Sequence, residues 1–147
     1  MWKKLIQTND DTVALVLRLA LGIVMFPHGA QKLLGWFGGR GLFGTIELFS
    51  QMGFPSILTV LVTMGEFFGG LGLLVGFLTR VAAAGIGIIM LGALLLVHWS
   101  NGFFMNWAGK QAGEGFEFHI LAVGLAVALI IRGGGKSSLD RSLAQQG

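Results

Sequence analysis

Glu66 is the only formally charged residue in an apolar run that extends from position 55 to position 78. A carboxyl group near the middle of a bilayer is costly, so an acid in such a run is usually paired or functional. Carboxyl and imidazole groups can both exchange protons, and His28 lies in the preceding apolar run. We therefore predict Glu66 and His28 as a proton-handling pair and assign any catalytic role to these two residues.

The partner of Glu66 follows from helix geometry. A helix over 55–78 is long enough to cross a bilayer, and side chains lean toward the N-terminus of their own helix. In two antiparallel helices, His28 and Glu66 therefore converge. We rank His28 first as the partner, Arg18 second because it is the stronger charge at a different depth, and Lys32 third because it lies nearer water. Such a pair could equally hold two helices together without a further role, and Lys32 could simply snorkel to the interface.

Further polar and aromatic residues gather at the outer ends of the expected helices, where they would form an outward-facing polar cup above Glu66. The candidate ligand-binding residues are Arg18, Lys32, Trp36, His98, Trp99, Phe103, Glu114 and Glu117. The aromatic members are also typical of a membrane-interface belt. His119 lies about 200° from Glu117 around a helix, so we do not expect both residues to point at one target. We predict no dedicated metal site, because His28 and His98 fall on separate helices.

The elements that position these residues are transmembrane helices. Of the 147 residues 54% are hydrophobic and 12% are charged, with a mean hydropathy of +0.77; soluble domains carry roughly 25% charged residues. The expected spans are 13–34, 55–78, 81–99 and 116–131. Between the first two, a helical repeat of apolar residues over 43–52 predicts a short amphipathic helix on the outer interface. We therefore predict an all-α, single-domain, polytopic membrane four-helix bundle.

Glycines and charges add three expectations. Gly65, Gly69, Gly72 and Gly76 share one helical stripe, which lets another helix approach closely and could serve a homo-oligomer. Basic residues favour the two termini and the 79–80 turn over the opposite ends, and the positive-inside rule then places both termini in the cytoplasm. The chain has no cysteine and no basic run with interleaved aromatics, which excludes thiol or iron–sulfur chemistry of its own and disfavours nucleic acid as a partner.

In order and spacing, these residues resemble the DoxX family of small bacterial and archaeal membrane proteins. The matching pieces are Arg18-x3-Gly22, His28-Gly29-x2-Lys32, Glu66-x2-Gly69-Gly70 with Thr79-Arg80, His98 with Gly102-Phe103-Phe104, Glu114-x2-Glu117 and Ser138-Leu139-Asp140. The resemblance covers nearly the whole chain. It implies a four-helix fold in the cytoplasmic (inner) membrane and an association with quinone-linked respiration, thiosulfate oxidation and oxidative-stress complexes.

Three functions stay open from the sequence. The leading hypothesis is a subunit of a quinone-linked redox or oxidative-stress system that binds a quinone or another apolar ligand in the polar cup. The second is a component of a proton-coupled small-molecule transporter, which would need oligomerisation because four helices are few. The third is a purely structural partner in a membrane assembly with respiratory or redox proteins. Whether the chain is itself an enzyme is not fixed by its residues.

Overall fold

A computed structural model describes residues 2–145, and all regular structure in this range is helical. The helices are α1 (Trp2–Ile6), α2 (Thr12–Leu34), α3 (Gly41–Gln51), α4 (Ser56–Val75), α5 (Thr79–Ala93), α6 (Glu117–Arg132) and α7 (Leu139–Gln145). A π-type turn (Leu94–His98) and a 3-10 turn (Trp99–Asn101) extend α5, and a further 3-10 turn (Trp36–Gly38) follows α2. The all-α prediction is confirmed.

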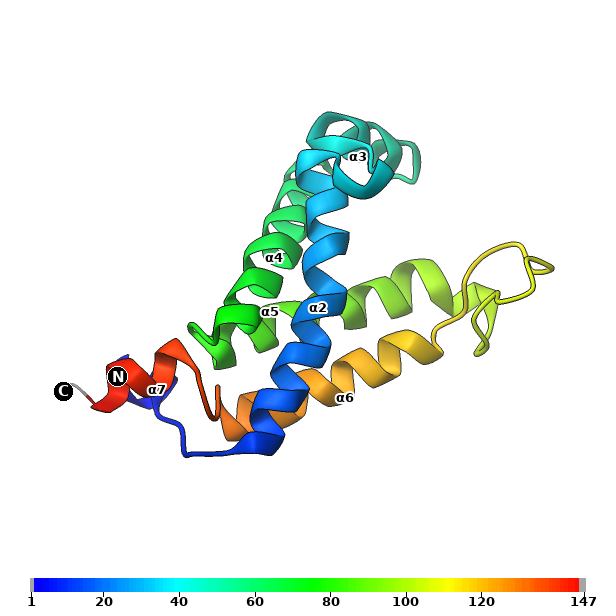
Figure 1. The fold of residues 1–147 in the computed structure, drawn as a ribbon. Coiled ribbons are helices and arrows are strands. Elements are labelled where there is room, and N and C mark those ends of the chain that lie inside the picture. Colours follow the sequence, from blue (N-terminus) through cyan, green and yellow to red (C-terminus); the bar gives the residue numbers. More distant parts are fainter. Residues whose placement is uncertain (1, 146–147) are drawn as a thin grey trace.

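The helices form two pairs that splay apart (Figure 1). α2 packs along α4, and α5 packs along α6, while α4 also contacts α5. The pairs converge around a buried apolar core and diverge toward α3 and the loop 102–116. The core comprises Leu21, Met25, Leu73, Ala83, Ile86, Met90, Ala122, Ala126 and Leu129. The two pairs therefore lie farthest apart at the end of the molecule away from α1 and α7, which is called the outer end below whatever its orientation in the membrane.

Three helical segments of the described chain are long and apolar enough to cross a membrane: Thr12–Leu34, Ser56–Val75 and Thr79–Asn101. They lie where the sequence predicts the first three spans. α6 also lies where the fourth is expected, but with 16 residues it is shorter than these three. That α6 crosses the whole membrane, and that the four helices form a membrane bundle, therefore remain predictions.

The close contact between α2 and α4 depends on two glycines that face the opposite backbone. A Cβ atom on Gly29 would lie 2.3 Å from the backbone nitrogen of Phe67, and one on Gly70 would lie 2.6 Å from that of Phe26. No side chain fits at such distances. These two glycines therefore allow the short distance between α2 and α4 and fix the register of one helix against the other.

The predicted glycine stripe on α4 meets α5 rather than α2. Cβ atoms on Gly65 and Gly69 would touch the side chains of Ile89 and Ile86, and Gly72 faces the start of α5. This part of the stripe is therefore filled by a helix of the same chain. It is not a free surface for a second copy, which corrects that element of the homo-oligomer expectation.

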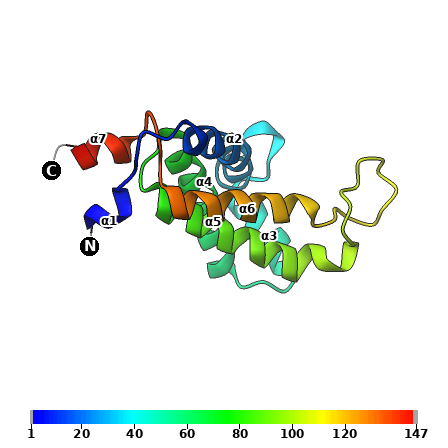
Figure 2. The same ribbon diagram turned by 90° about the horizontal axis from the view of Figure 1, so that it is seen from below.

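The end of the molecule that holds both termini is closed by polar contacts. Figures 1 and 2 show α1 and α7 side by side at this end. The Asp140 carboxylate accepts hydrogen bonds from the backbone N–H groups of Leu78 (2.7 Å) and Thr79 (2.8 Å), and so caps α5. Asp11 caps α2 and forms an ion pair with Arg132 at the end of α6. The termini thus share one side, while their cytoplasmic orientation stays a prediction.

Candidate functional site

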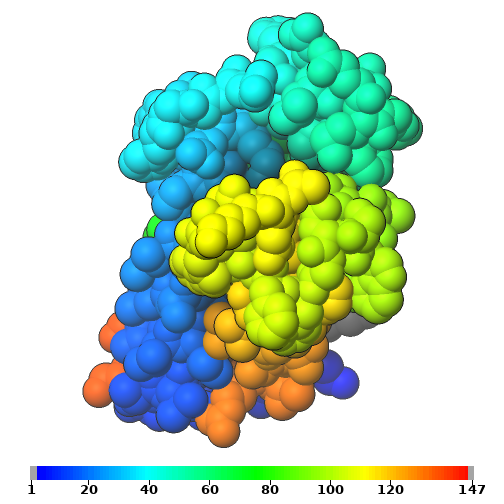
Figure 3. All heavy atoms as spheres, turned by 90° about the vertical axis from the view of Figure 1, so that its right-hand side faces the viewer, coloured from blue at the N-terminus to red at the C-terminus, as the bar shows by residue number. Residues whose placement is uncertain are grey.

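A cleft of about 730 Å³ occupies the space between the splayed helix pairs. Figure 3 looks onto this splayed end, with the loop after α5 below the layer formed by α3. Most of the lining is apolar and comes from α3, α4 and α5, including Phe49, Leu58, Leu61, Ile88 and Leu96. The polar lining is confined to two groups of side chains, one on each helix pair.

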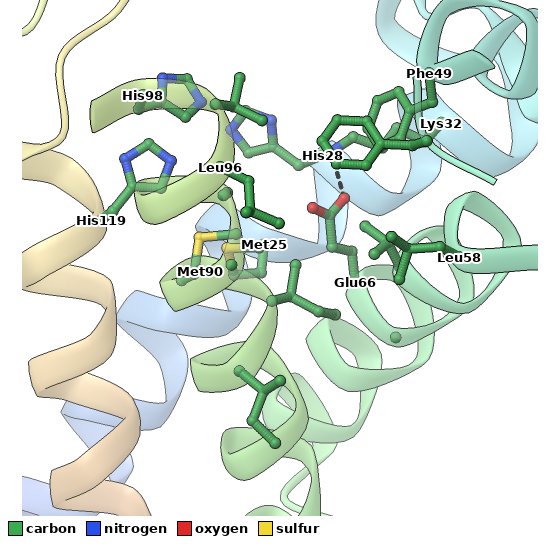
Figure 4. A pocket seen from close by; sticks show the side chains of 18 of the residues that line it. Met25, His28, Lys32, Phe49, Leu58, Glu66, Met90, Leu96, His98 and His119 are labelled. Carbon is green, nitrogen blue, oxygen red and sulfur yellow. Dashed lines mark hydrogen bonds and ion pairs between the residues drawn. The ribbon is translucent and has the colours of Figure 1, made fainter. Parts of the chain in front are cut away.

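The first polar group centres on a buried ion pair between Lys32 of α2 and Glu66 of α4 (Figure 4). The Glu66 side chain is 4% exposed and that of Lys32 is 26% exposed, so the carboxylate is the more deeply buried partner. The Lys32 ammonium donates its hydrogen bond to Oε2 of Glu66. The low-dielectric surroundings strengthen this attraction, which offsets the cost of placing a carboxylate there.

The predicted ranking of partners for Glu66 is wrong, because Lys32, ranked third, forms the ion pair. Depths counted from the ends of the apolar runs put Lys32 near water. In the structure, Gly29 packs directly on the backbone of Glu66 and Phe67, so Lys32 stands only about one helical turn above Glu66. Its side chain leans back along α2 and spans that distance, whereas the shorter ring of His28 does not form the pair.

His28 lies one turn before Lys32 and lines the same cleft. Its side chain is exposed there, and Figure 4 shows the ring beside the ion pair. The predicted pair of His28 and Glu66 is thus a shared location rather than a hydrogen bond. A ligand in the cleft would meet the imidazole, the ammonium and the carboxylate together.

Arg18 lies outside the cleft and is 1% exposed. Its guanidinium donates hydrogen bonds to the carbonyl oxygens of Leu73 (2.8 Å), Leu74 (2.7 Å) and Gly134 (3.0 Å), and a longer one to Ser137. These contacts tie the C-terminal end of α4 to the segment after α6. The prediction that Arg18 contacts Glu66 or lines the polar cup is not supported, because its donors are engaged at the opposite end of the molecule.

The second polar group lies on the other wall and consists of His98, at the end of α5, and His119 of α6. Their ring centroids are 4.2 Å apart. Nδ1 of His98 lies 2.8 Å from the carbonyl oxygen of Glu114, and Glu114 also lines the cleft. His119 is 6% exposed, and its Nδ1 is buried without a hydrogen-bond partner among residues 2–145.

His119 lines the cleft although the sequence does not predict it as a site residue. It does point away from Glu117, as expected, but it is His119 that faces the cleft. Glu117 accepts a hydrogen bond from the backbone of Met105 and does not line the cleft. One sequence signal was available: His98 and His119 flank a single outer connection, which brings the ends of α5 and α6 together.

The predicted aromatic residues lie around the outer end but outside the cleft. Trp36, Trp99 and Phe103 are 53%, 61% and 48% exposed. Trp99 stacks on Phe116 with centroids 5.2 Å apart, and Phe103 meets the same ring edge-on at 5.6 Å. Their exposure fits the interface-belt interpretation better than direct ligand contact. Among the described residues, no group of three or more histidine, cysteine, aspartate or glutamate side chains is placed to hold a metal ion.

Comparisons with known proteins agree with this architecture. The chain is 33% identical over 135 residues to the protein named "Inner membrane protein YqjF" of Escherichia coli, covering 91% of this chain and 94% of that protein. It is 28% identical over 115 residues to the "Putative oxidoreductase CatD" of Bacillus subtilis, covering 78% of this chain and 76% of that one. No solved structure gives a significant match. The DoxX family model matches residues 13–99, which carry α2 to α5 and the Lys32–Glu66 pair, and the chain belongs to the DoxX family of membrane proteins.

Proposed function

We propose that this protein is an inner-membrane subunit of a quinone-linked redox or oxidative-stress system, and that it binds a quinone or a similar apolar ring in the cleft. The observation that carries the proposal is a buried ion pair and an exposed histidine at the wall of a largely apolar cleft of about 730 Å³. Ligand pockets typically have about this volume and combine apolar walls with a few polar groups. Two relatives carry names that point to the inner membrane and to oxidoreductase activity.

The chemistry assigned to the chain is hydrogen bonding and proton transfer. Reduction of a quinone to a quinol takes two electrons and two protons. The chain has no cysteine, and a redox partner protein would supply the two electrons. The Lys32 ammonium would donate a hydrogen bond to a quinone oxygen, while Glu66 and His28 would relay protons toward it. The apolar walls would hold the ring and its lipid tail and keep bulk water away from the ion pair.

Binding in a defined bilayer tests the proposal. The purified protein, reconstituted in phosphatidylcholine nanodiscs, would be titrated with decylubiquinone, and quenching of tryptophan fluorescence would be compared with that of free tryptophan analogues in the same discs. We expect saturable quenching by the wild type and weaker binding by Glu66→Gln. Glu47→Gln makes the same chemical change on the exposed side of α3, outside the cleft, and should bind like the wild type.

Two outcomes would reject the proposal. Quenching that rises in proportion to the quinone in the membrane, without saturation, would mean that the cleft holds no quinone site. Equal affinities for Glu66→Gln, Glu47→Gln and the wild type would place any quinone away from the ion pair. Solute flux in proteoliposomes that is lost in Glu66→Gln, with no quinone binding, would favour the transporter hypothesis instead.

A further inference from the structure

The histidine pair on the α5–α6 wall has hydrogen-bonding capacity that the protein itself does not use. A backbone carbonyl oxygen can only accept, so the contact with Glu114 requires the proton of His98 to sit on Nδ1. In neutral His98 the lone pair is therefore on Nε2. His119, almost completely buried, keeps an Nδ1 without a partner among the described residues. Buried polar atoms are nearly always hydrogen-bonded, and an exception in a cleft wall points to a ligand.

The arrangement of the two polar groups constrains what such a ligand looks like. Lys32, Glu66 and His28 lie on the α2–α4 side of the cleft, and His98 and His119 lie on the α5–α6 side. Figure 4 shows the rings of His98 and His119 beside each other and away from the ion pair. The ring of His28 lies between this histidine pair and the ion pair. The remaining lining is almost entirely apolar. A ligand that satisfies both walls must carry polar atoms at two ends of an apolar body.

We propose that His98 and His119 form a second binding station in the cleft. The ligand is a ring with oxygens at opposite positions, and this station binds the reduced, hydroxyl-bearing form of that ring. The inference rests on the proposed function and adds which end of the ring the histidines bind. Nε2 of neutral His98 accepts a hydrogen bond, so it can bind a quinol O–H but not a quinone carbonyl. Two imidazoles with centroids 4.2 Å apart disfavour a double charge, so at least one of them stays neutral. Binding of the quinol at this station requires that His98 is neutral.

The test compares oxidised and reduced ligand on matched variants. Decylubiquinone and, under anaerobic conditions, its quinol would be titrated against the protein in phosphatidylcholine nanodiscs. His98 is only partly buried, so His98→Leu should fold, and circular dichroism would confirm its helix content. Loss of one hydrogen bond should weaken quinol binding by about tenfold and quinone binding by less than about twofold. His98→Gln, whose amide oxygen can accept the same hydrogen bond, should retain most of the quinol affinity.

The buried His119 gives a second, independent variant. His119→Leu should also weaken quinol more than quinone, and double substitution should not add a second full loss if both rings serve one oxygen. Equal losses for quinol and quinone, or unchanged quinol affinity in both single variants, would overturn the second station while leaving the proposed function in place. Absence of saturable binding of either form to the wild type would reject the proposed function and this inference together.

Discussion

Separating the two members of the ion pair should have unequal effects on stability. Glu66 is 4% exposed and Lys32 is 26% exposed, so the carboxylate has less access to water than the ammonium. Removing one partner of a buried pair typically costs about 3–5 kcal/mol, because an uncompensated charge is left behind. Lys32→Met leaves the deeply buried carboxylate and should approach this range. Glu66→Leu leaves an ammonium on a flexible stem that can move toward water, and should cost only about 1–3 kcal/mol.

The double variant isolates the interaction. Replacing both charges by apolar side chains leaves no buried charge, and such replacements are often neutral or stabilising. We therefore expect Lys32→Met/Glu66→Leu to be more stable than Lys32→Met alone, with a coupling energy of about 1–3 kcal/mol. Glu66→Leu should likewise be tolerated better together with Lys32→Met than by itself.

The free energy of unfolding can be measured in bicelles by steric trapping, with Glu47→Leu on α3 as the control for a carboxylate that is exposed. The control should change stability by less than about 0.5 kcal/mol. Strict additivity of the two single substitutions would refute the reasoning, because it would mean that Lys32 and Glu66 do not stabilise each other. A larger loss for Glu66→Leu than for Lys32→Met would refute the argument from burial.

Three further predictions concern the scaffold. Gly29→Ala should destabilise the fold by more than about 3 kcal/mol, because its Cβ would lie 2.3 Å from backbone, whereas Gly124→Ala, which faces open space, should be neutral in the same unfolding assay. Arg18→Lys should lower the melting temperature nearly as much as Arg18→Met, because an ammonium cannot reproduce the forked contacts to separate carbonyls; full rescue by lysine would contradict this. The hydrogen bond from Arg132 lowers the pKa of Asp11, so its stabilisation is present above the ordinary carboxyl value and is lost as pH falls through the lowered one. Asp11→Asn should flatten the acid limb of a pH–stability curve, and an unchanged limb would exclude the contact.

The helices were predictable because each depends on local signals. The apolar runs, their spacing and the glycines and prolines between them place α2, α4 and α6 within a few residues of the structure, and likewise α5 together with the two turns that extend it to Asn101. The prediction for the second span ran too far, to position 78. Gly76 takes a left-handed conformation (φ 70°) and ends α4 at Val75. A glycine stripe that continues to Gly76 gives no local sign that the last member ends the helix.

The pairing within the site was less predictable because it depends on the register between two helices. Counting residues from the membrane boundary assumes that the start of α2 and the end of α4 lie at equal depth. The register is instead fixed where Gly29 meets the backbone of Glu66 and Phe67. His119 is not predicted for a different reason: its direction was judged relative to Glu117. The face on which the cleft opens is instead set by how α5 and α6 splay from the other pair. The π-type turn Leu94–His98 also changes the direction of His98 relative to a regular helix.

The two ends of the molecule are held together by different contacts, and this difference accounts for the apolar cleft between the helix pairs at the outer end. At the end with the termini, Arg18 and Asp140 bind backbone groups of neighbouring segments and hold the helices together. At the outer end, the Lys32–Glu66 pair joins only α2 to α4, and the histidine pair joins only α5 to α6. Among the described residues, no polar side-chain contact crosses between the helix pairs at this end. The helix pairs can therefore separate at this end without breaking a buried hydrogen bond, and a ligand that binds both walls would supply the missing connection between them.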